Sequence, residues 1–375
     1  MSYLIVPKDY KPIIEARKNQ IAIKEIKDYF QHELAIFLAL RRTTAPLFVT
    51  PESGLNDNLN GVERTVDFTL KDMDERPVEV VQSLAKWKRM ALAKYGIEPG
   101  EGIYTDMNAI RRDEELDNLH SIYVDQWDWE KVITKEQRKI EYLKETVKTI
   151  YAALKALERK VNFLYPEMEI DLPENIYFIT TQELEDMYPD SDPEERENII
   201  AKEQKAVFLM KIGGLLKSGK KHDGRAPDYD DWELNGDIIF WNDILDRAFE
   251  ISSMGIRVDE VSLVKQLKEA GAEDRMKLEF HKKIIAKKLP YSIGGGIGHN
   301  RTFVSRNIPE DHVVRHDPSL PIGRVGEKVQ VRLTGQRMRI FDRISDSIDV
   351  FYRCFEVFIY PYASCLAKSY SGFLR

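Results

Sequence analysis

Apolar residues recur at a helical spacing near the start of the chain. Across residues 11–40 they fall close to every 3.6 positions, which predicts one amphipathic helix with a single core-facing side. Pro46 then opens an extended segment. The same periodicity returns further along the chain and predicts helices over residues 84–94, 135–161, 194–205 and 258–288.

Residues 62–70 show a different pattern, in which apolar and polar side chains alternate. Val62, Val66, Phe68 and Leu70 would share one face of an extended segment, so the alternation predicts a half-buried strand. Shorter runs predict further strands over residues 78–81, 122–129, 206–212, 237–241 and 248–257. Strands at irregular spacing, with hairpin-type pairs among helices, indicate an α+β fold with a largely antiparallel sheet flanked by helices.

The composition fits one large domain and disfavours several classes of protein. With 375 residues and 43% hydrophobic content, the chain can bury a full core. A net charge of -7 disfavours tight, non-specific binding to nucleic acid, so no tRNA partner is expected. The sequence has no apolar run of roughly 20 residues and no signal peptide, which predicts a cytoplasmic protein without membrane contact. Cys354 and Cys365 lack the spacing of a disulfide framework or a zinc site, so no structural metal is expected.

Three arginines in separate stretches stand where a nucleoside triphosphate can be held. Arg111 is followed two residues later by Asp113, then by a short polar loop and a strand; the alternative register that begins at Arg112 stays open. Arg225 lies in a polar, turn-rich loop. Arg301 follows a glycine run that is neither a Walker loop nor a dinucleotide fingerprint. Arginine suits phosphate because its charge is permanent and its planar fork binds two oxygens at once.

The strand predicted after Arg111 carries polar residues on one side. Ile122, Val124, Gln126 and Asp128 share that face, which would form the wall of a site. Asp128 can accept hydrogen bonds from a substrate ammonium group, and Gln126 can bind a carboxylate or an α-phosphate. The alternative is that these two side chains simply end the strand in solvent.

Five strings along the chain are specific enough to compare with known families: HSIYVDQWDWE, HDGRAPDYDDW, NGDI, FEISSMGIR and GGGIG. Together they resemble ammonia-dependent asparagine synthetase (aspartate–ammonia ligase). The resemblance runs from about Ile21 to Arg301, and it implies that residues 1–301 have the catalytic fold of class II aminoacyl-tRNA synthetases. Arg111 would then belong to motif 2 of that fold and the glycine run to motif 3. Residues 302–375 depart from the family.

This family implies an ATP-dependent reaction in two steps. The β-carboxylate of aspartate attacks the α-phosphate of magnesium-ATP, which gives β-aspartyl-AMP and pyrophosphate; ammonia then displaces AMP and gives asparagine. The ligands expected are therefore aspartate, ammonia, ATP and Mg²⁺. The helix of residues 11–40 and the extended segment at Pro46 resemble motif 1 of the fold, which implies a homodimer.

The resemblance also implies roles for individual residues around the nucleotide. Arg111 would hold the α-phosphate and neutralise the charge that develops as the carboxylate attacks. Arg301 would pack on the nucleotide beside Gly295 and Gly296. Two acids on separate strands would hold magnesium between the phosphates. These are Asp237 and Glu250, the second expected on one face with Ala248 and Ser252.

The remaining candidates would contact aspartate or ammonium. Lys88 is expected to bind the α-carboxylate, with Lys86 as the surface alternative, and Ser83 is expected to cap the helix that carries both. Asp57 would hold ammonium and take up a proton as ammonia attacks. The catalytic set is Arg111, Asp57, Gln126 and Asp230, and the substrate-binding set is Ser83, Lys88, Asp128, Arg225, Tyr229, Ser252, Ser253 and Arg257.

Two other functions stay open at the level of sequence. A tRNA-charging synthetase for aspartate or asparagine would carry an anticodon-binding module, typically a barrel of about five strands. The residues before Pro46 predict a helix instead. The second alternative is an inactive relative that has lost its activity through the altered residues 302–375.

Overall fold

The computed structural model describes residues 13–57, 59 and 63–299. These residues all lie in the first of the chain's two compact units, Met1–His316. Their helices agree closely with the periodic segments of the sequence. The α-helices are α1 (Ala16–Leu38), α2 (Ala85–Tyr95), α3 (Ile140–Leu164), α4 (Thr181–Met187), α5 (Pro193–Gln204), α6 (Glu260–Glu269) and α7 (Glu279–Ile285). Short 3-10 helices are η1 (Pro51–Ser53), η2 (Lys71–Met73), η3 (Pro166–Met168) and η4 (Glu273–Lys277).

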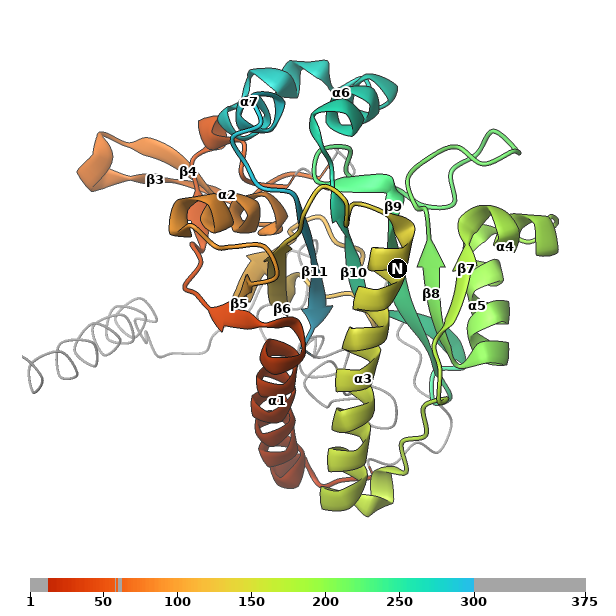
Figure 1. Ribbon diagram of the computed structural model, residues 1–375. Helices are drawn as coiled ribbons and strands as arrows, with labels where there is room; N and C mark the ends of the chain where they lie inside the picture. The colour runs from red at the N-terminus through yellow and green to blue at the C-terminus, as the bar shows by residue number, and fades with distance from the viewer. Residues whose placement is uncertain (1–12, 58, 60–62, 300–375) are drawn as a thin grey trace, which may run out of the picture. The chain divides into compact units, whose positions relative to one another are not determined.

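Within the described residues, an eight-stranded sheet forms the centre of the fold (Figure 1). Its strands run in the order β1 (Leu40–Arg42), β5 (Gly102–Ile110), β6 (Tyr123–Val132), β11 (Ser292–Gly298), β10 (Arg247–Arg257), β9 (Asp230–Asn242), β8 (Ala206–Met210) and β7 (Tyr177–Thr180). Only the outermost pairs, β1 with β5 and β7 with β8, are parallel; the other neighbours are antiparallel. The expectation of a largely antiparallel sheet flanked by helices is therefore confirmed.

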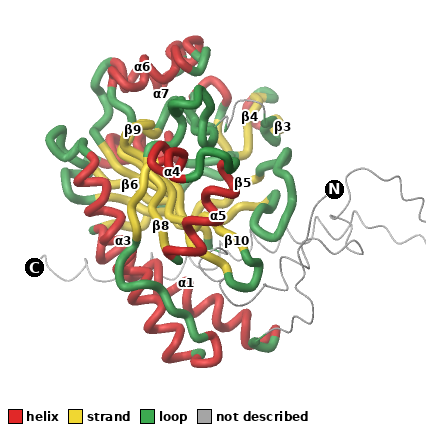
Figure 2. Tube along the Cα trace, turned by 90° about the vertical axis from the view of Figure 1, so that its right-hand side faces the viewer, coloured by secondary structure: helices red, strands yellow, loops and turns green. Residues whose placement is uncertain are grey.

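Helices cover both faces of this sheet, as the strand alternation requires (Figure 2). Phe208 of β8 belongs to the core under α1 and α3, together with Phe30 and Ile150. The next residue along β8, Leu209, instead packs against Ile200 of α5. Since neighbouring residues of a strand point to opposite faces, α1 and α3 lie on one side of the sheet and α5 on the other. None of the helices in the described part has the length and apolar character to cross a membrane.

The helix expected over residues 258–288 is divided into α6, η4 and α7, so this prediction was wrong in its length. Gly271, just after α6, has a φ of 63°, a left-handed conformation that glycine adopts without steric cost. The chain turns there, and α7 folds back beside α6. Phe280 of α7 packs against Leu263 and Leu267 of α6 in a small core of its own.

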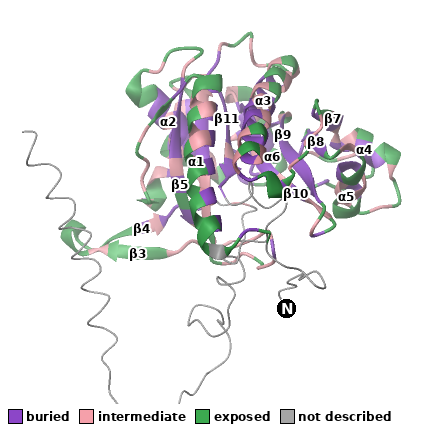
Figure 3. Ribbon diagram, turned by 90° about the horizontal axis from the view of Figure 1, so that it is seen from below, coloured by how far each residue is buried: buried purple, intermediate pink, exposed green. Residues whose placement is uncertain are grey.

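The strand expected over residues 62–70 is shorter and more exposed than its alternation suggested. It begins at Asp67 as β3 (Asp67–Leu70), and it pairs with β4 (Arg76–Val80), which pairs in turn with β2 (Phe48–Val49). Phe68 is 39% exposed and meets Phe48 edge-on, at 5.3 Å between ring centroids. Figure 3 shows β3 in the colour of exposed residues. Alternation detected a strand here, but its apolar face is covered only in part: Leu70 is half-buried and Phe68 is exposed. Val62 lies outside the described residues.

Candidate active site

A cavity of about 680 Å³ lies over the sheet face opposite α1 and α3. Its walls come from β6, β10 and β11, from the start of α2, and from the loop before β9. This volume lies within the range of about 300–1,000 Å³ that is usual for small-molecule sites.

Strand β6 supplies one wall. Val124, Gln126 and Asp128 line the cavity, whereas Trp127 and Trp129 are buried in the core on the other face. Trp127 packs against Phe30 of α1, with 4.9 Å between ring centroids. Of the predicted face, Val124, Gln126 and Asp128 line the cavity and Ile122 does not, because β6 begins at Tyr123. The two tryptophans fix which way the polar residues of β6 point, and the contacts of these residues with substrate stay a prediction.

Arg111 is the first residue after β5, and it lines the cavity. Its Nε is buried without a hydrogen-bond partner among the described residues, and its guanidinium lies 3.7 Å from Glu114. Arg112 does not line the cavity and donates to the backbone oxygen of Thr65 at 3.1 Å. Asp113 is paired with Arg64. Of the two registers that the sequence left open, the structure therefore supports Arg111.

Arg225 reaches the same cavity from the loop before β9. It donates to Ser253 of β10 and, at 2.6 Å, to the carboxylate of Asp237 of β9. Burial raises the pKa of Asp237 to about 7, while the charge of Arg225 acts in the opposite direction. Asp237 does not line the cavity, so of the two predicted magnesium ligands only Glu250 does. Asp237 instead forms an ion pair with Arg225.

A β-bulge in β10 corrects the predicted arrangement of Glu250 and Ser252. The register with β9 shifts between these two residues, so they do not share a face. Glu250 and Ser253 line the cavity, whereas Ser252 is buried between Ile238 and Ile297 and lies outside the lining. The expected contact of Ser252 with substrate is therefore not supported, because one extra residue reversed the alternation.

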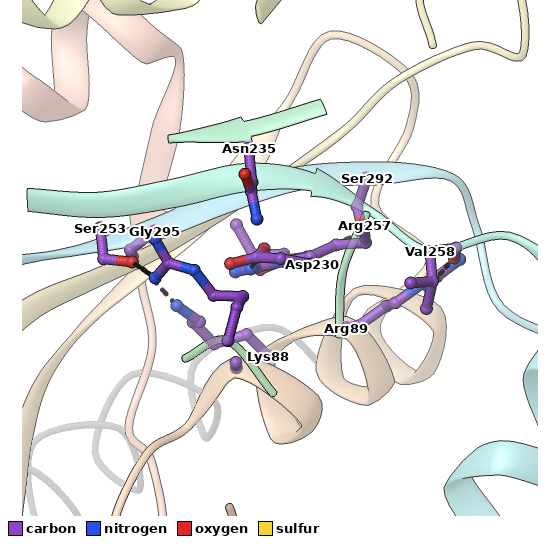
Figure 4. Close-up of polar contacts among 12 residues, drawn as sticks. Lys88, Arg89, Asp230, Asn235, Ser253, Arg257, Val258, Ser292 and Gly295 are labelled. Carbon is purple, nitrogen blue, oxygen red and sulfur yellow. Dashed lines mark hydrogen bonds and ion pairs between the residues drawn. The ribbon is translucent and has the colours of Figure 1, made fainter. Parts of the chain in front are cut away.

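Lys88 of α2 is fully buried and points across the cavity toward the sheet (Figure 4). Its Nζ is paired with Asp128 of β6 and donates to the backbone oxygen of Gly295 at 3.0 Å. Lys86 is also buried, so its expected place at the surface was wrong. Its Nζ lies 2.8 Å from Asp228 and donates to the backbone oxygen of Asn56 at 2.9 Å. Because α2 starts inside the protein, both lysines face inward.

Arg257 of β10 is held between two buried carboxylates. Glu130 accepts from its Nε at 3.0 Å and from its Nη2 at 2.7 Å, and Asp230 accepts from its Nη1. Figure 4 shows Asp230 and Arg257 side by side. Asp230 lines the cavity together with Tyr229, whose ring centre is 5.7 Å from the guanidinium carbon. Glu130 was missing from the candidate set, although it continues the period-two face of Gln126 and Asp128 by one more step.

Asp57 and Ser83 both line the cavity. Asp57 is 2% exposed, and its Oδ1 accepts from the backbone N–H of Leu59 at 2.9 Å. Burial raises the pKa of this carboxyl group. The expected capping role of Ser83 was wrong: Leu84 is the N-cap residue of α2, and Ser83 Oγ accepts from the N–H of Ala85 at 3.2 Å.

The glycines of β11 let side chains of the neighbouring strands lie close against its backbone. A Cβ atom on Gly296 would come within 2.2 Å of Gln126 Oε1, and one on Gly295 within 2.6 Å of Met254 Cβ. Both glycines line the cavity. Arg301 lies outside the described residues, so its place over the nucleotide stays a prediction.

The described lining is more acidic than basic. It contains ten carboxylates but only four lysine or arginine side chains. The carboxylates are Asp57, Glu63, Asp113, Glu114, Glu115, Asp125, Asp128, Asp223, Asp230 and Glu250, and the cations are Lys88, Arg111, Arg225 and Arg257. A polyanionic ligand would therefore need an additional cation to enter this cavity.

Comparison with solved structures identifies the fold. Asparaginyl-tRNA synthetase from Pyrococcus horikoshii, complexed with asparaginyl-adenylate, aligns over 76% of this chain and 66% of its own, with a TM-score of 0.53 and 14% identity. Aspartyl-tRNA synthetase from Entamoeba histolytica aligns over 77% of this chain and 56% of its own, with a TM-score of 0.51 and 16% identity. The described domain thus has the class II aminoacyl-tRNA synthetase fold.

Comparison with sequences is more specific. A family model described as aspartate-ammonia ligase matches residues 17–313. The aspartate–ammonia ligase of Ruminiclostridium cellulolyticum is 63% identical over 301 residues, which cover 80% of this chain and 90% of that protein. The enzyme of Clostridium tetani is 64% identical over 298 residues, covering 80% of this chain and 87% of that protein. The chain belongs to the aspartate–ammonia ligase family.

Proposed function

We propose that this chain makes asparagine from aspartate and ammonia, through a β-aspartyl-AMP intermediate that forms and reacts in the cavity described above. The observation that carries the proposal is the convergence of Arg111 and Arg225 on one cavity, opposite the polar face of β6. These groups come from segments far apart in the sequence, and each carries a charge that aspartate and ATP require.

In the first half-reaction, a β-carboxylate oxygen of aspartate attacks the α-phosphorus of ATP and pyrophosphate leaves. Negative charge builds on the oxygens of the α-phosphate during this step. Arg111 is suited to stabilise it, because its guanidinium lines the cavity and its nearest carboxylate is 3.7 Å away. Gln126 would orient the attacking carboxylate or the phosphate from the wall of β6.

The acidic lining fits a nucleotide that arrives with magnesium. Magnesium is usually held by one or two carboxylates, and phosphate oxygens and water would supply the rest of its coordination here. Glu250 would hold the ion at the cavity, while Asp237 balances Arg225 beneath it. When bound, magnesium would neutralise phosphate charge and assist the departure of pyrophosphate.

The buried pair of Lys88 and Asp128 is suited to a zwitterion. The α-carboxylate of aspartate can exchange onto Lys88 while its α-ammonium group binds Asp128, with Asp230 beside it. Both charges of the pair then stay compensated on binding, which avoids the large penalty of an unpaired buried charge. Substrate held in this way would present its β-carboxylate to the nucleotide.

In the second half-reaction, ammonia attacks the β-carbonyl carbon and AMP leaves with the electrons of the carbon–oxygen bond. Ammonium must lose a proton before nitrogen has a lone pair to donate. Asp57 is suited to accept that proton, because burial raises the pKa of its carboxyl group. The product is the β-amide of aspartate.

We also propose that the enzyme is a homodimer, works in the cytoplasm where its substrates are found, and needs no tRNA. Apolar side chains exposed on and after α1 support the dimer. Ile36 is 61% exposed, and Leu47 is 53% exposed. A second copy is the partner that motif 1 of this fold implies, and sedimentation velocity measures it directly.

Pyrophosphate release in the presence of ATP, aspartate and ammonium tests the function. We expect release that depends on aspartate and ammonium and does not change when tRNA is added. Dependence on tRNA would instead indicate a synthetase. No release under any of these conditions would indicate an inactive relative.

A further inference from the structure

Two buried acceptor atoms face the cavity without a partner among the described residues. They are Asp57 Oδ2 and Gln82 Oε1. Both residues line the cavity, at 2% and 0% exposure. A buried acceptor without a hydrogen bond costs on the order of 1–3 kcal/mol, so two in one place require an explanation.

The surrounding hydrogen bonds fix the orientation of the Gln82 amide. Its Nε2 donates to the backbone oxygen of Asp57 at 2.9 Å, so the opposite orientation would bring two oxygens together. Asn56 Oδ1 accepts from the backbone N–H of Gln82 at 2.8 Å and from that of Asp57 at 3.0 Å. Residues 57 and 82 are thus held to each other, with an oxygen of each left for a ligand.

We propose that Asp57 Oδ2 and Gln82 Oε1 form a subsite for ammonium ion. The inference rests on the proposed function, and it adds Gln82 as a second group that binds the nitrogen substrate. Ammonium has four N–H donors, no acceptor and one positive charge, so it matches a carboxylate and an amide oxygen. Water can also donate to two acceptors, but it carries no positive charge to compensate the Asp57 carboxylate.

The chain carries an ammonium group of its own close by, on Lys86. The charge of Lys86 lowers the pKa of the Asp57 carboxyl group more than the charge of Arg111 does. Neither cation makes a hydrogen bond or ion pair with Asp57 in the described part of the chain. Lys86 Nζ is instead bound to Asp228 at 2.8 Å. The same carboxylate oxygen lies 3.0 Å from His281 Nε2 and 3.2 Å from Arg275 Nη1. Asp228 is therefore a positioning residue that keeps Lys86 away from the subsite.

The same subsite can also accept the proton that ammonium must lose. Ammonium bound there gives one proton to Asp57 Oδ2 and becomes ammonia, which stays hydrogen-bonded to Gln82 Oε1. The freed lone pair forms the new carbon–nitrogen bond, and AMP leaves with the electrons of the carbon–oxygen bond. The nitrogen then carries three protons and a positive charge; the amide keeps two of them, and the third passes to solvent as AMP leaves.

Replacement of Gln82 by methionine tests the subsite, since Q82M keeps the side-chain length and removes the acceptor. The KM for ammonium is measured at saturating ATP and aspartate, and aspartate-dependent ATP–pyrophosphate exchange is measured without ammonium. We expect a rise of about tenfold in the ammonium KM, equivalent to about 1.4 kcal/mol, with exchange changed by less than about twofold. An unchanged ammonium KM, or equal losses in both assays, would overturn the proposal.

Gln266 provides a matched control, because it is also buried, makes three hydrogen bonds and does not line the cavity. We expect Gln266→Met to lower the melting temperature without a selective rise in the ammonium KM. Absence of exchange in the unmodified enzyme would refute the proposed function instead, so the two failures can be told apart.

The role of Asp228 is tested by a double substitution. In D228N, Lys86 loses its carboxylate and is expected to pair with Asp57, which raises the ammonium KM. Adding Lys86→Met removes the competing cation and should bring that KM back toward the value of the unmodified enzyme. If the double variant binds ammonium more weakly than D228N, Asp228 has only a structural role and this part of the proposal is wrong.

Discussion

At the scale of single residues, several buried charges of the site are compensated by a named partner. Arg257 is the clearest example, since Glu130 and Asp230 hold its guanidinium from two strands. The ion pair of Arg257 and Glu130 stabilises the fold only while both charges are present, because a buried charge without its partner is poorly solvated. We therefore expect Glu130 to act through the position of Arg257 rather than by touching substrate.

Glu130→Gln is expected to lower the free energy of unfolding by about 3 kcal/mol, because it leaves part of the Arg257 charge uncompensated in the interior. Urea unfolding at neutral pH measures this difference. Glu101→Gln is the control, since Glu101 forms an exposed pair with Arg41 at 3.2 Å and should contribute less than about 1 kcal/mol. Equal effects of the two substitutions would contradict the account.

Arg111→Lys is expected to slow aspartate-dependent ATP–pyrophosphate exchange by about 100-fold or more, since lysine lacks the planar fork with which arginine binds two phosphate oxygens at once. Arg112→Lys is the matched control. Its side chain does not line the cavity and makes one hydrogen bond to a backbone oxygen. Exchange in that variant should stay within about twofold of the unmodified enzyme; the reverse order of effects would show that Arg112 is the motif 2 arginine.

At the scale of elements, the alternation along each strand decides which side chains line the cavity and which enter the core. A β-bulge changes this assignment locally. Sequence patterns located β6, β10 and the long helices, because each has a sustained period. They could not locate the bulge between Glu250 and Ser252, since the register depends on pairing with β9. They also missed β7 and α4, which are too short to show a period, and they extended one helix through Gly271 because its apolar spacing continues beyond the turn.

The glycines of β11 have a measurable role in this arrangement. Gly296→Ala is expected to displace the Gln126 amide, whose Oε1 would lie 2.2 Å from the added Cβ, and so to reduce exchange activity by about tenfold or more. Gly214→Ala is a suitable control, because a Cβ there meets nothing within 4 Å. Full activity of the Gly296 variant would mean that Gln126 is not needed where the structure places it.

Asp125 links three elements and predicts a dependence of stability on acid pH. This residue of β6 lies 3.3 Å from Lys27 of α1 and 3.3 Å from His299, just after β11. Burial raises the pKa of Asp125, but the hydrogen bond and charge of His299 and the charge of Lys27 outweigh it and lower the pKa to about 2. Because the folded pKa lies below the unfolded value of about 3.9, the stabilisation is complete above that value and is lost as pH falls toward 2.

Asp125→Asn should therefore lower the free energy of unfolding by about 2 kcal/mol at pH 5, and by much less near pH 2. Urea unfolding of both proteins between these two values measures the difference. A gap that stays constant across this range would show that the carboxylate charge of Asp125 does not contribute.

At the scale of the whole molecule, the fold brings together residues that no local pattern could join. Most of the residues that the family resemblance singled out line the cavity, including Arg111 and Arg225, because their strings are specific. It placed Lys86 at the surface and missed Glu130, because burial depends on how α2 and β6 pack against the rest of the chain. Gln82 was not recognised as a site residue either, since a glutamine shows its function only when its unpaired oxygen can be seen.

The most direct test of the account follows the oxygen of the β-carboxylate. Aspartate labelled with oxygen-18 in that group is incubated with the enzyme, ATP, magnesium and ammonium, and the AMP produced is analysed by mass spectrometry. A β-aspartyl-AMP intermediate predicts transfer of one labelled oxygen to the phosphate of AMP. Unlabelled AMP, or formation of ADP with labelled phosphate, would contradict the central claim.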